Sequence, residues 1–419
     1  MISKDSDITK LSERKNFIWN LFGSLSTAII SVIFLLVVSR LATTSQTDTF
    51  SFAYALGSLL VIIGLFQVRN YQATDIQRTF EFTTYFFARL VTIGIMIGIT
   101  IIYLMMKDYT SEKSALIFLM ILYRSTDAFS DVYQGIFQQH ERLDLAGKSL
   151  FFRNMWIIVA FILGLFWQRN IIDAMVWVLI ISTISILYLD ILKARQFENI
   201  GTYKINWKLI FKLLRECFPL FINGFLLLYI YNYPKYVIDN FLEAGILKPG
   251  VQKDFNIIFM PTFVMNLLML FFRPLITKMA IFFSEKKIHF FYKIQVQLFS
   301  WLLAIGCLVL GGSFVAGIPF LNMLYGVHLN DLKLAFMLLM VSGLLSSYAI
   351  AIDNILTVIR KQKLLIVSYL LSFLVTIIFS PYLVKTYSIL GASIAFFCAM
   401  FIWLLSSLCI YLYIKRKTW

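Results

Sequence analysis

Five polar residues recur at helical spacing within one apolar stretch of the chain. They are Arg124, Asp127, Asp131, Gln134 and Gln138. With about 100° between successive residues of an α-helix, the five share one stripe that is less than about a quarter-turn wide. Charged side chains are unfavourable in hydrocarbon and usually mark a function there. We therefore expect this stripe to line a watery cavity or a helix interface.

The types of these side chains allow two interpretations. In the first, Arg124 holds an anionic group of a substrate, while Asp127 or Asp131 binds and releases a coupling cation. In the second, Arg124 and Asp127, which are three residues apart, neutralise each other as a buried structural ion pair. The sequence leaves both interpretations open.

Two further polar stripes have the same helical spacing. One consists of Ser342, Ser346, Asp353 and Arg360, and the other of Asn16, Asn20, Ser24, Thr27 and Ser31. For Asp353 the same two interpretations stay open, a structural role or the binding of substrate or a coupling ion. Asn20 is a candidate for contact with the substrate.

Two more arginines lie near the cytoplasmic ends of predicted membrane spans. An Arg at such a place is usually an anchor whose guanidinium reaches the lipid headgroups, and this interpretation applies to Arg69. After Arg273 the apolar sequence continues to Phe283, so an anchoring role fits that residue less well. Because Arg offers forked donors that match phosphate oxygens, we predict that Arg69, Arg124 and Arg273 together bind an anionic headgroup.

The stretch 213–236 contains helix-breaking residues near both of its ends. Pro219 and Asn223 come early, and Asn232 and Pro234 come late. Such residues favour either a bending gate or a static kink. Asn223 and Asn232 are further candidates for substrate contact. Four tyrosines of this stretch either stack on sugar rings or form an interfacial aromatic belt, namely Tyr229, Tyr231, Tyr233 and Tyr236.

The elements that must position these residues are membrane helices. The mean hydropathy is +0.82, 60% of the residues are hydrophobic and 14% are charged, which excludes an ordinary water-soluble domain. The net charge of +15 comes from Lys and Arg scattered over short loops, which favours anionic membrane lipid over nucleic acid as a partner. The four cysteines form no CxxC pair and have no neighbouring His cluster, so neither disulfides nor a metal site are indicated.

Twelve apolar runs are long enough to cross a hydrocarbon core of about 30 Å. The sequence therefore predicts an all-α membrane protein with about 12 transmembrane helices. The runs lie near 17–39, 48–69, 84–106, 114–138, 149–167, 171–193, 213–236, 255–283, 294–316, 332–358, 364–384 and 389–414.

Positive charge at the ends of these runs predicts their orientation. Lys and Arg cluster before the first run, after the last, and in the loop 193–215. Both termini and this loop are therefore expected on the cytoplasmic side. The loop separates two six-helix lobes, 1–205 and 206–419. Weak similarities between them, such as Asp131 against Asp353, favour an internal repeat with pseudo-symmetric lobes around a central cavity.

Four short motifs carry a family resemblance that extends over the whole chain. They are WNLFGS at 19–24, FSFAYA at 50–55, RNYQ at 69–72 and LGASIA at 390–395. In this order, with two six-helix halves, they resemble the bacterial O-antigen and capsule-type flippases of the multidrug/oligosaccharidyl-lipid/polysaccharide exporter superfamily. The resemblance implies a protein that moves undecaprenyl-diphosphate-linked oligosaccharide repeat units from the cytoplasmic to the outer leaflet by alternating access, for surface polysaccharide biosynthesis.

The resemblance also implies a multi-pass protein of the bacterial cytoplasmic membrane that is not an enzyme. We expect no cofactor, coupling to Na⁺ or H⁺, and a monomer that works beside a polysaccharide polymerase and export machinery. Two other classes were weighed. A cation-coupled multidrug exporter would share the fold but should have a mainly acidic cavity. A membrane-embedded polymerase or glycosyltransferase would need catalytic groups in a sizeable loop, and the stretch 235–254 offers Asp239 and Glu243 but no His. The sequence contains no P-loop, HExxH or GxSxG motif, so no catalytic residues are predicted.

Overall fold

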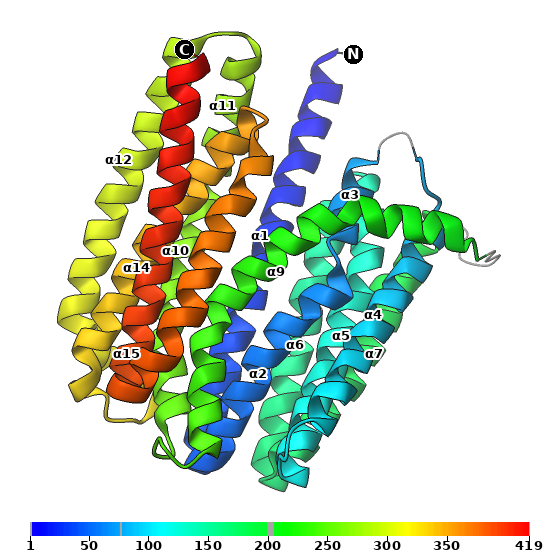
Figure 1. Ribbon diagram of the computed structural model, residues 1–419. Coiled ribbons are helices and arrows are strands. Elements are labelled where there is room, and N and C mark those ends of the chain that lie inside the picture. The colour runs from blue at the N-terminus through cyan, green and yellow to red at the C-terminus, as the bar shows by residue number, and fades with distance from the viewer. Residues whose placement is uncertain (1, 76–77, 199–204, 419) are drawn as a thin grey trace. The chain divides into compact units, whose positions relative to one another are not determined.

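The computed structural model describes residues 2–75, 78–198 and 205–418, and every regular element in this part of the chain is a helix (Figure 1). Two π-helical turns, Leu187–Ile191 and Ser313–Gly317, extend the helices before them, and 3-10 turns occur at Asn330–Leu332 and Gln362–Leu364. The α-helices are α1 (Ile2–Leu41), α2 (Thr44–Leu65), α3 (Val68–Thr74), α4 (Phe82–Met105), α5 (Ser111–Gln139), α6 (Leu143–Gln168), α7 (Ile171–Ile186), α8 (Leu192–Ala194), α9 (Trp207–Glu243), α10 (Val251–Phe271), α11 (Arg273–Ser284), α12 (Ile288–Gly312), α13 (Ile318–Tyr325), α14 (Lys333–Val358) and α15 (Leu365–Thr418).

The predicted all-α membrane fold is confirmed. Within the described residues, nine helical stretches are long and apolar enough to cross a bilayer. The last of them, Gln362–Arg416, contains two predicted spans, because α15 is interrupted at Ser388, where φ is 51° and ψ is −126°. The predicted spans 114–138 and 255–283 are not among the nine, since the first is the charge-bearing α5 and the second is divided into α10 and α11.

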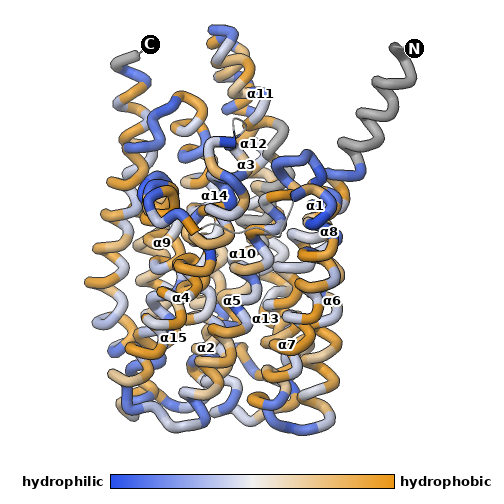
Figure 2. Tube along the Cα trace, turned by 90° about the vertical axis from the view of Figure 1, so that its right-hand side faces the viewer, coloured by the Kyte–Doolittle hydropathy of each residue, from blue (hydrophilic) through white to orange (hydrophobic). Residues whose placement is uncertain are grey.

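Apolar side chains cover the outer faces of the long helices, as a lipid solvent requires. Hydrophobic residues occupy the middle of these helices, and hydrophilic residues gather toward their ends (Figure 2). Large exposed apolar side chains include Met105, Trp167, Leu308 and Val315, each more than 70% exposed. A water-soluble protein would bury such residues, so this surface belongs in hydrocarbon.

The chain divides by its contacts into two compact units, Met1–Phe225 and Leu226–Trp419. The division falls inside α9, because the first half of this helix packs on unit 1. Ile210, Leu213 and Cys217 of α9 are buried in a cluster with Val68 of α3 and Tyr133 of α5. The lobe boundary at 205/206 stays a prediction.

In unit 1, α5 lies at the centre of the packing and contacts α2, α3, α4, α6 and α7. Helix α1 packs closely along α6, and a Cβ at Gly147 would collide with the backbone of Trp19. Because α5 has neighbours on most of its sides, its polar stripe must find partners on other helices.

In unit 2, α14 packs mainly against α15, α10 and α12. The aromatic core of unit 2 includes Tyr231 of α9, Phe255 and Phe259 of α10, and Phe396 of α15. The buried face of α14 carries Ser342, Ser346 and Asp353, so the polar stripe of this helix is turned inward.

Candidate functional site

The first charged cluster of unit 1 is built around Asp131 of α5. One carboxylate oxygen accepts from Arg69 Nη1 at 3.3 Å, and the other accepts from Arg89 Nη2 at 2.7 Å. Arg89 lies on α4, is fully buried, and also donates to the carbonyl of Gly64 at 2.7 Å. One aspartate thus lies between two guanidiniums inside the helix bundle.

Arg69 is turned toward α5 by a break in the chain between α2 and α3. The two residues at this break, Phe66 and Gln67, both have positive φ angles. Besides Asp131, the Arg69 guanidinium donates to two side-chain amides on the α5 stripe. The acceptors are Gln134 Oε1 at 2.7 Å and Gln138 Oε1 at 3.2 Å. Three of the five stripe residues therefore bind one arginine from a neighbouring element.

The second cluster is centred on Asp127, one turn before Asp131. Its two carboxylate oxygens accept from Arg124 Nη1 at 3.1 Å and from Arg153 Nη2 of α6 at 2.9 Å. The Arg124 guanidinium also lies over the ring of Tyr54 at 4.6 Å and donates to Ser58 at 3.3 Å. The ion pair between Arg124 and Asp127 that the spacing suggested is present, and a second arginine joins it.

A buried carboxylate on α7's π-helical extension extends this network. Asp190 accepts hydrogen bonds from Ser130 at 2.6 Å and from Ser149, and Ser130 accepts from Gln134 at 3.1 Å. The charged network of unit 1 therefore consists of four arginines, at 69, 89, 124 and 153, and three aspartates, at 127, 131 and 190. One positive charge is left over in this group.

Some guanidinium N–H groups in the network lack an acceptor. Among the described residues, Nε of Arg89, Arg124 and Arg153 and Nη1 of Arg153 are buried without a hydrogen-bond partner. Buried donors without acceptors are unfavourable, and an anion or water beside them would satisfy them. The surplus of donors and of positive charge suits an anionic ligand better than a cationic one.

The carboxylate of Asp353 in unit 2 has a different environment from that of Asp131. It accepts from Ser407 at 2.9 Å, from the Tyr369 hydroxyl at 2.9 Å and from Trp403 Nε1 at 3.1 Å, all on α15. Within the described residues none of its partners is charged. At corresponding positions of the predicted repeat, Asp131 is thus bound by arginines and Asp353 by neutral donors.

A buried lysine accompanies the predicted Asn232. Lys235 of α9 donates to Asn232 Oδ1 at 3.3 Å, and its ammonium lies 4.4 Å from the ring centre of Phe259. Its side chain is among the buried polar groups of unit 2, as is Asp353. The structure therefore brings a cation and an aromatic ring to this candidate position.

The other predicted residues are placed as follows. Asn20 is partly buried on α1, and Asn223 on α9 has a buried Oδ1 without a hydrogen-bond partner in the described structure. Arg273 begins α11, but its side chain lies outside the described part, so the predicted site of three arginines stays a prediction. No group of three or more His, Cys, Asp or Glu able to hold a metal occurs among the residues described.

Four ionisable residues that the structure places inside helices are absent from the predicted site. Arg89, Arg153, Asp190 and Lys235 all lie within predicted spans, and that position alone was the available signal. None of them belongs to a polar stripe at helical spacing, such as the one on α5. Their partners lie on other helices, so only tertiary structure reveals the network.

Outside the membrane helices, a carboxylate organises the turn after α3. Asp75 accepts from the backbone N–H groups of Thr79 at 2.9 Å and Phe80 at 3.1 Å, and from the Tyr85 hydroxyl at 2.7 Å. Burial opposes ionisation, but these hydrogen bonds outweigh it and hold the pKa of Asp75 below its usual range. A hydrogen bond with Glu216 of α9, assisted by burial, raises the pKa of Tyr71 to about 12.

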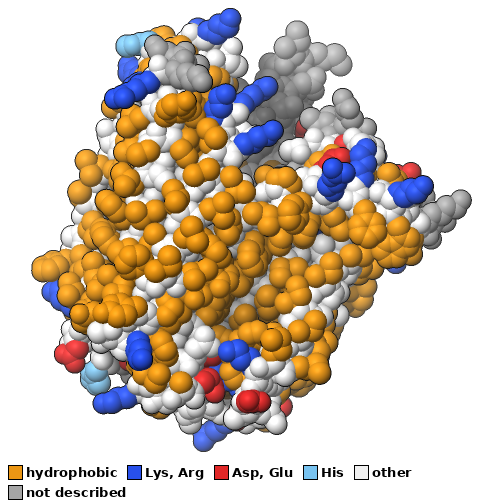
Figure 3. Space-filling model, in the orientation of Figure 1, with side chains coloured by type: hydrophobic (Ala, Val, Ile, Leu, Met, Phe, Trp, Pro, Cys, Tyr) orange, Lys and Arg blue, Asp and Glu red, His pale blue; other side chains and the backbone are white. Residues whose placement is uncertain are grey.

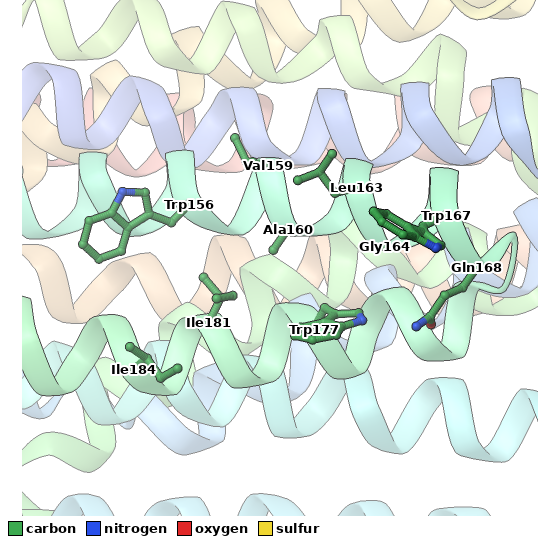
Figure 4. A pocket seen from close by; sticks show the side chains of 10 residues that line it. All are labelled: Trp156, Val159, Ala160, Leu163, Gly164, Trp167, Gln168, Trp177, Ile181 and Ile184. Carbon is green, nitrogen blue, oxygen red and sulfur yellow. The ribbon is translucent and has the colours of Figure 1, made fainter.

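A separate groove of about 630 Å³ lies between α6 and α7 and contains no charged side chain (Figure 4). Trp156, Trp167 and Trp177 line it together with aliphatic residues. It has none of the groups that a hydrated or ionic substrate needs, so the candidate functional site is the charged network rather than this groove.

The arrangement of helices defines the class of protein. The structure matches an outward-facing multidrug resistance MATE family transporter of the MOP superfamily, with a TM-score of 0.61 at 13% identity, over 97% of this chain and 95% of that one. It also matches a MOP superfamily transporter from Pyrococcus furiosus, with a TM-score of 0.59 at 13% identity over the same shares. The fold is therefore shared with the MOP (multidrug/oligosaccharidyl-lipid/polysaccharide) transporters, and the nine long apolar helical stretches among the described residues make this chain a multi-pass membrane protein.

The family follows from the sequence comparisons. The model of the family described as polysaccharide biosynthesis protein matches residues 14–272, so the chain belongs to that family. Over 401 residues it is 22% identical to the capsular polysaccharide biosynthesis protein CapF of Staphylococcus aureus, covering 94% of this chain and 97% of that one. The resemblance found in the four short motifs is confirmed.

Proposed function

We propose that this transporter is a flippase for undecaprenyl-diphosphate-linked oligosaccharide repeat units. It moves them from the cytoplasmic to the outer leaflet of the bacterial cytoplasmic membrane by alternating access, for surface polysaccharide biosynthesis. The observation that carries the proposal is the arginine-rich network of unit 1 in a chain of the polysaccharide biosynthesis family. A polymerase and export machinery would take over the flipped units.

The chemistry of such a substrate matches the network. A diphosphate and a hydrated glycan both lose solvation when they pass through hydrocarbon, and a single charge at the bilayer centre costs about 2.5 to 3.5 kcal/mol on insertion scales. Arg69 and Arg124 keep partly exposed side chains and offer forked donors, while Arg89 and Arg153 are buried behind them. We infer that the exposed pair contacts the diphosphate and that the buried pair holds Asp127 and Asp131 in place.

We assign the coupling role to Asp353 rather than to the aspartates of α5. Protonating Asp127 or Asp131 would leave buried guanidiniums without their counter-charge, which is strongly unfavourable. Protonating Asp353 removes a charge from a low-dielectric site, and its three partners are neutral. The Ser407 hydroxyl can donate to the ionised form or accept from the protonated one, so both states keep their hydrogen bonds. This favours H⁺ as the coupling ion.

The multidrug exporter remains the second candidate because the fold is shared with MATE transporters. An organic cation would meet four arginines against three aspartates in unit 1, so this network disfavours it. A polymerase would need a catalytic constellation, whereas the three aspartates of the charged network are partners of arginine or serine.

Depletion of the protein in its host tests the proposal. Lipid-linked repeat units should accumulate on the cytoplasmic side, where an externally added impermeant oxidant of sugars cannot reach them. Re-expression should restore oxidation and surface polymer together. Accumulation of units that are already open to the external oxidant would place the defect after flipping and exclude this function.

A further inference from the structure

A pocket of about 740 Å³ lies at one end of unit 2, and its lining shares no residue with the charged network of unit 1. It is formed by α11, the start of α12 and the end of α14. Ile276, Ala280 and Phe283 of α11 line it with apolar groups, and Asn354 and Thr357 of α14 line it with polar ones. Its volume suits a headgroup-sized ligand.

Two cationic residues complete the lining of this pocket. Lys286 follows the end of α11 and Arg360 follows the end of α14, both with positive φ, at 59° and 58°. Within the described residues neither side chain has a carboxylate partner. A basic residue at a helix C-terminus commonly interacts with the last carbonyls of that helix, which accounts for Lys286 and for Arg360 separately. It does not explain why two helix ends meet around a pocket with apolar walls.

The surroundings add positive charge and little to neutralise it. The stretches 275–293 and 354–364 contain one acidic residue, Glu285, and its carboxylate pairs with Lys287 at 2.8 Å. The carboxylate of Asp353, the residue before Asn354, accepts hydrogen bonds from α15 and is not part of the pocket lining. Lys and Arg side chains gather at this end of unit 2, near the C-terminus (Figures 1 and 3). An anion entering the pocket would therefore be attracted and not repelled.

We propose that this pocket binds the phosphate group of a membrane lipid at the cytoplasmic surface. The positive-inside pattern puts the loops that carry Lys286 and Arg360 on that side. The two cations hold the phosphate, Asn354 and Thr357 bond its polar substituent, and the apolar wall of α11 accepts the start of the hydrocarbon chain. The ligand is either an anionic phospholipid or a polyprenyl diphosphate, and the site does not depend on the proposed flippase activity.

Lipid binding to the purified full-length protein, measured by native mass spectrometry after delipidation, tests the proposal. The probes are phosphatidylglycerol, polyprenyl diphosphate, phosphatidylcholine and inorganic pyrophosphate. The variant K286Q/R360Q removes the two lining cations. Its matched control, K361Q/K363Q, removes two charges from the loop after α14 outside the lining and leaves the Glu285–Lys287 pair intact. At about 1 kcal/mol for each basic residue near a membrane surface, K286Q/R360Q should bind the preferred anionic lipid about 30-fold more weakly.

A third variant separates the pocket from charge alone. Ala280→Phe keeps every cation but fills the apolar side, so it should also weaken binding, while K361Q/K363Q stays within about twofold of the wild type. Tighter binding of phosphatidylglycerol or of polyprenyl diphosphate identifies the lipid source. Equal losses in K286Q/R360Q and K361Q/K363Q would show unspecific attraction and overturn the site. Binding of inorganic pyrophosphate as tight as that of the lipids, or unaltered binding in A280F, would overturn its lipid character.

Discussion

Replacing Asp131 by leucine is expected to destabilise unit 1 strongly, because it removes the counter-charge of a buried arginine. Arg89 is fully buried and donates to two acceptors, the Asp131 carboxylate at 2.7 Å and the Gly64 carbonyl at 2.7 Å. Without the carboxylate, its charge stays buried with a single neutral acceptor. Breaking a buried ion pair in this way typically costs about 3 to 5 kcal/mol of unfolding free energy.

The two arginines that share Asp131 should respond differently. Arg69 keeps its acceptors on Gln134 and Gln138 and its side chain is 23% exposed, so it can remain solvated when Asp131 is lost. In Arg89→Met the Gly64 carbonyl still accepts from Thr92 at 2.7 Å, so no acceptor is orphaned there. The double variant R89M/D131L removes both buried charges and should recover most of the loss seen in D131L.

Unfolding of the purified protein in detergent, followed for the wild type, R89M, D131L and R89M/D131L, measures these differences as a double-mutant cycle. R69M serves as the control, with an expected loss of about 1 to 2 kcal/mol from its charge-assisted hydrogen bonds. If the losses of R89M and D131L simply add in the double variant, or if D131L is no less stable than R69M, the assignment of a tightly coupled buried pair is refuted.

Three further outcomes are expected. Because the pKa of Asp75 is lower in the folded than in the unfolded protein, the hydrogen bonds around it stabilise the fold above about pH 4, and this stabilisation is lost as the pH falls further. D75N should remove that part of the pH dependence of the unfolding free energy. The same loss of stability at low pH in D75N and in the wild type would contradict this prediction. In complementation of polymer export at normal expression, variants of Arg124 and Arg273 should show a graded loss, with Lys weaker than Arg and Ala weaker than Lys, whereas full export by both Lys variants would favour anchoring and ion-pair roles. Asp353→Asn should fold and bind substrate but lose the response of transport to a pH gradient; a retained response would move the coupling site elsewhere.

Hydropathy and helical spacing predicted the fold and one face of the site. The length and polarity of apolar runs decide where helices form in lipid, so the spans could be placed without tertiary information. The α5 stripe was visible because its residues share one helix. The division of α15 was visible in the same way, since the predicted spans 364–384 and 389–414 lie on either side of Ser388, where the helix is interrupted.

The rest of the network depended on which helices meet. Arg89 and Arg153 are the single charged residues of the predicted spans 84–106 and 149–167, and nothing in those spans indicates that they pair with Asp131 and Asp127. The opposite environments of Asp131 and Asp353 were equally hidden, because the sequence shows a carboxylate at each place but not its donors. Periodicity finds residues that share a helix face, whereas pairing across helices is a property of packing.

The packing of the first half of α9 on unit 1 was also not predictable from the sequence. The basic loop 193–215 suggested where one half ends, but Ile210, Leu213 and Cys217 present apolar groups that fit the cluster around α3 and α5. Charge in a loop reports which side of the membrane it faces. It does not report which helices the following segment packs against.

Reconstitution tests the central claim most directly. Purified protein is placed in liposomes with a fluorescent undecaprenyl-diphosphate-linked oligosaccharide, and an impermeant quencher reports the share of the probe in the outer leaflet. The flippase account predicts that a proton gradient drives the probe across with the wild type, and that R69A/R124A and empty liposomes leave it in place. No movement of this probe by the wild type, together with gradient-driven transport of an organic cation by the same liposomes, would contradict the account and establish a multidrug exporter.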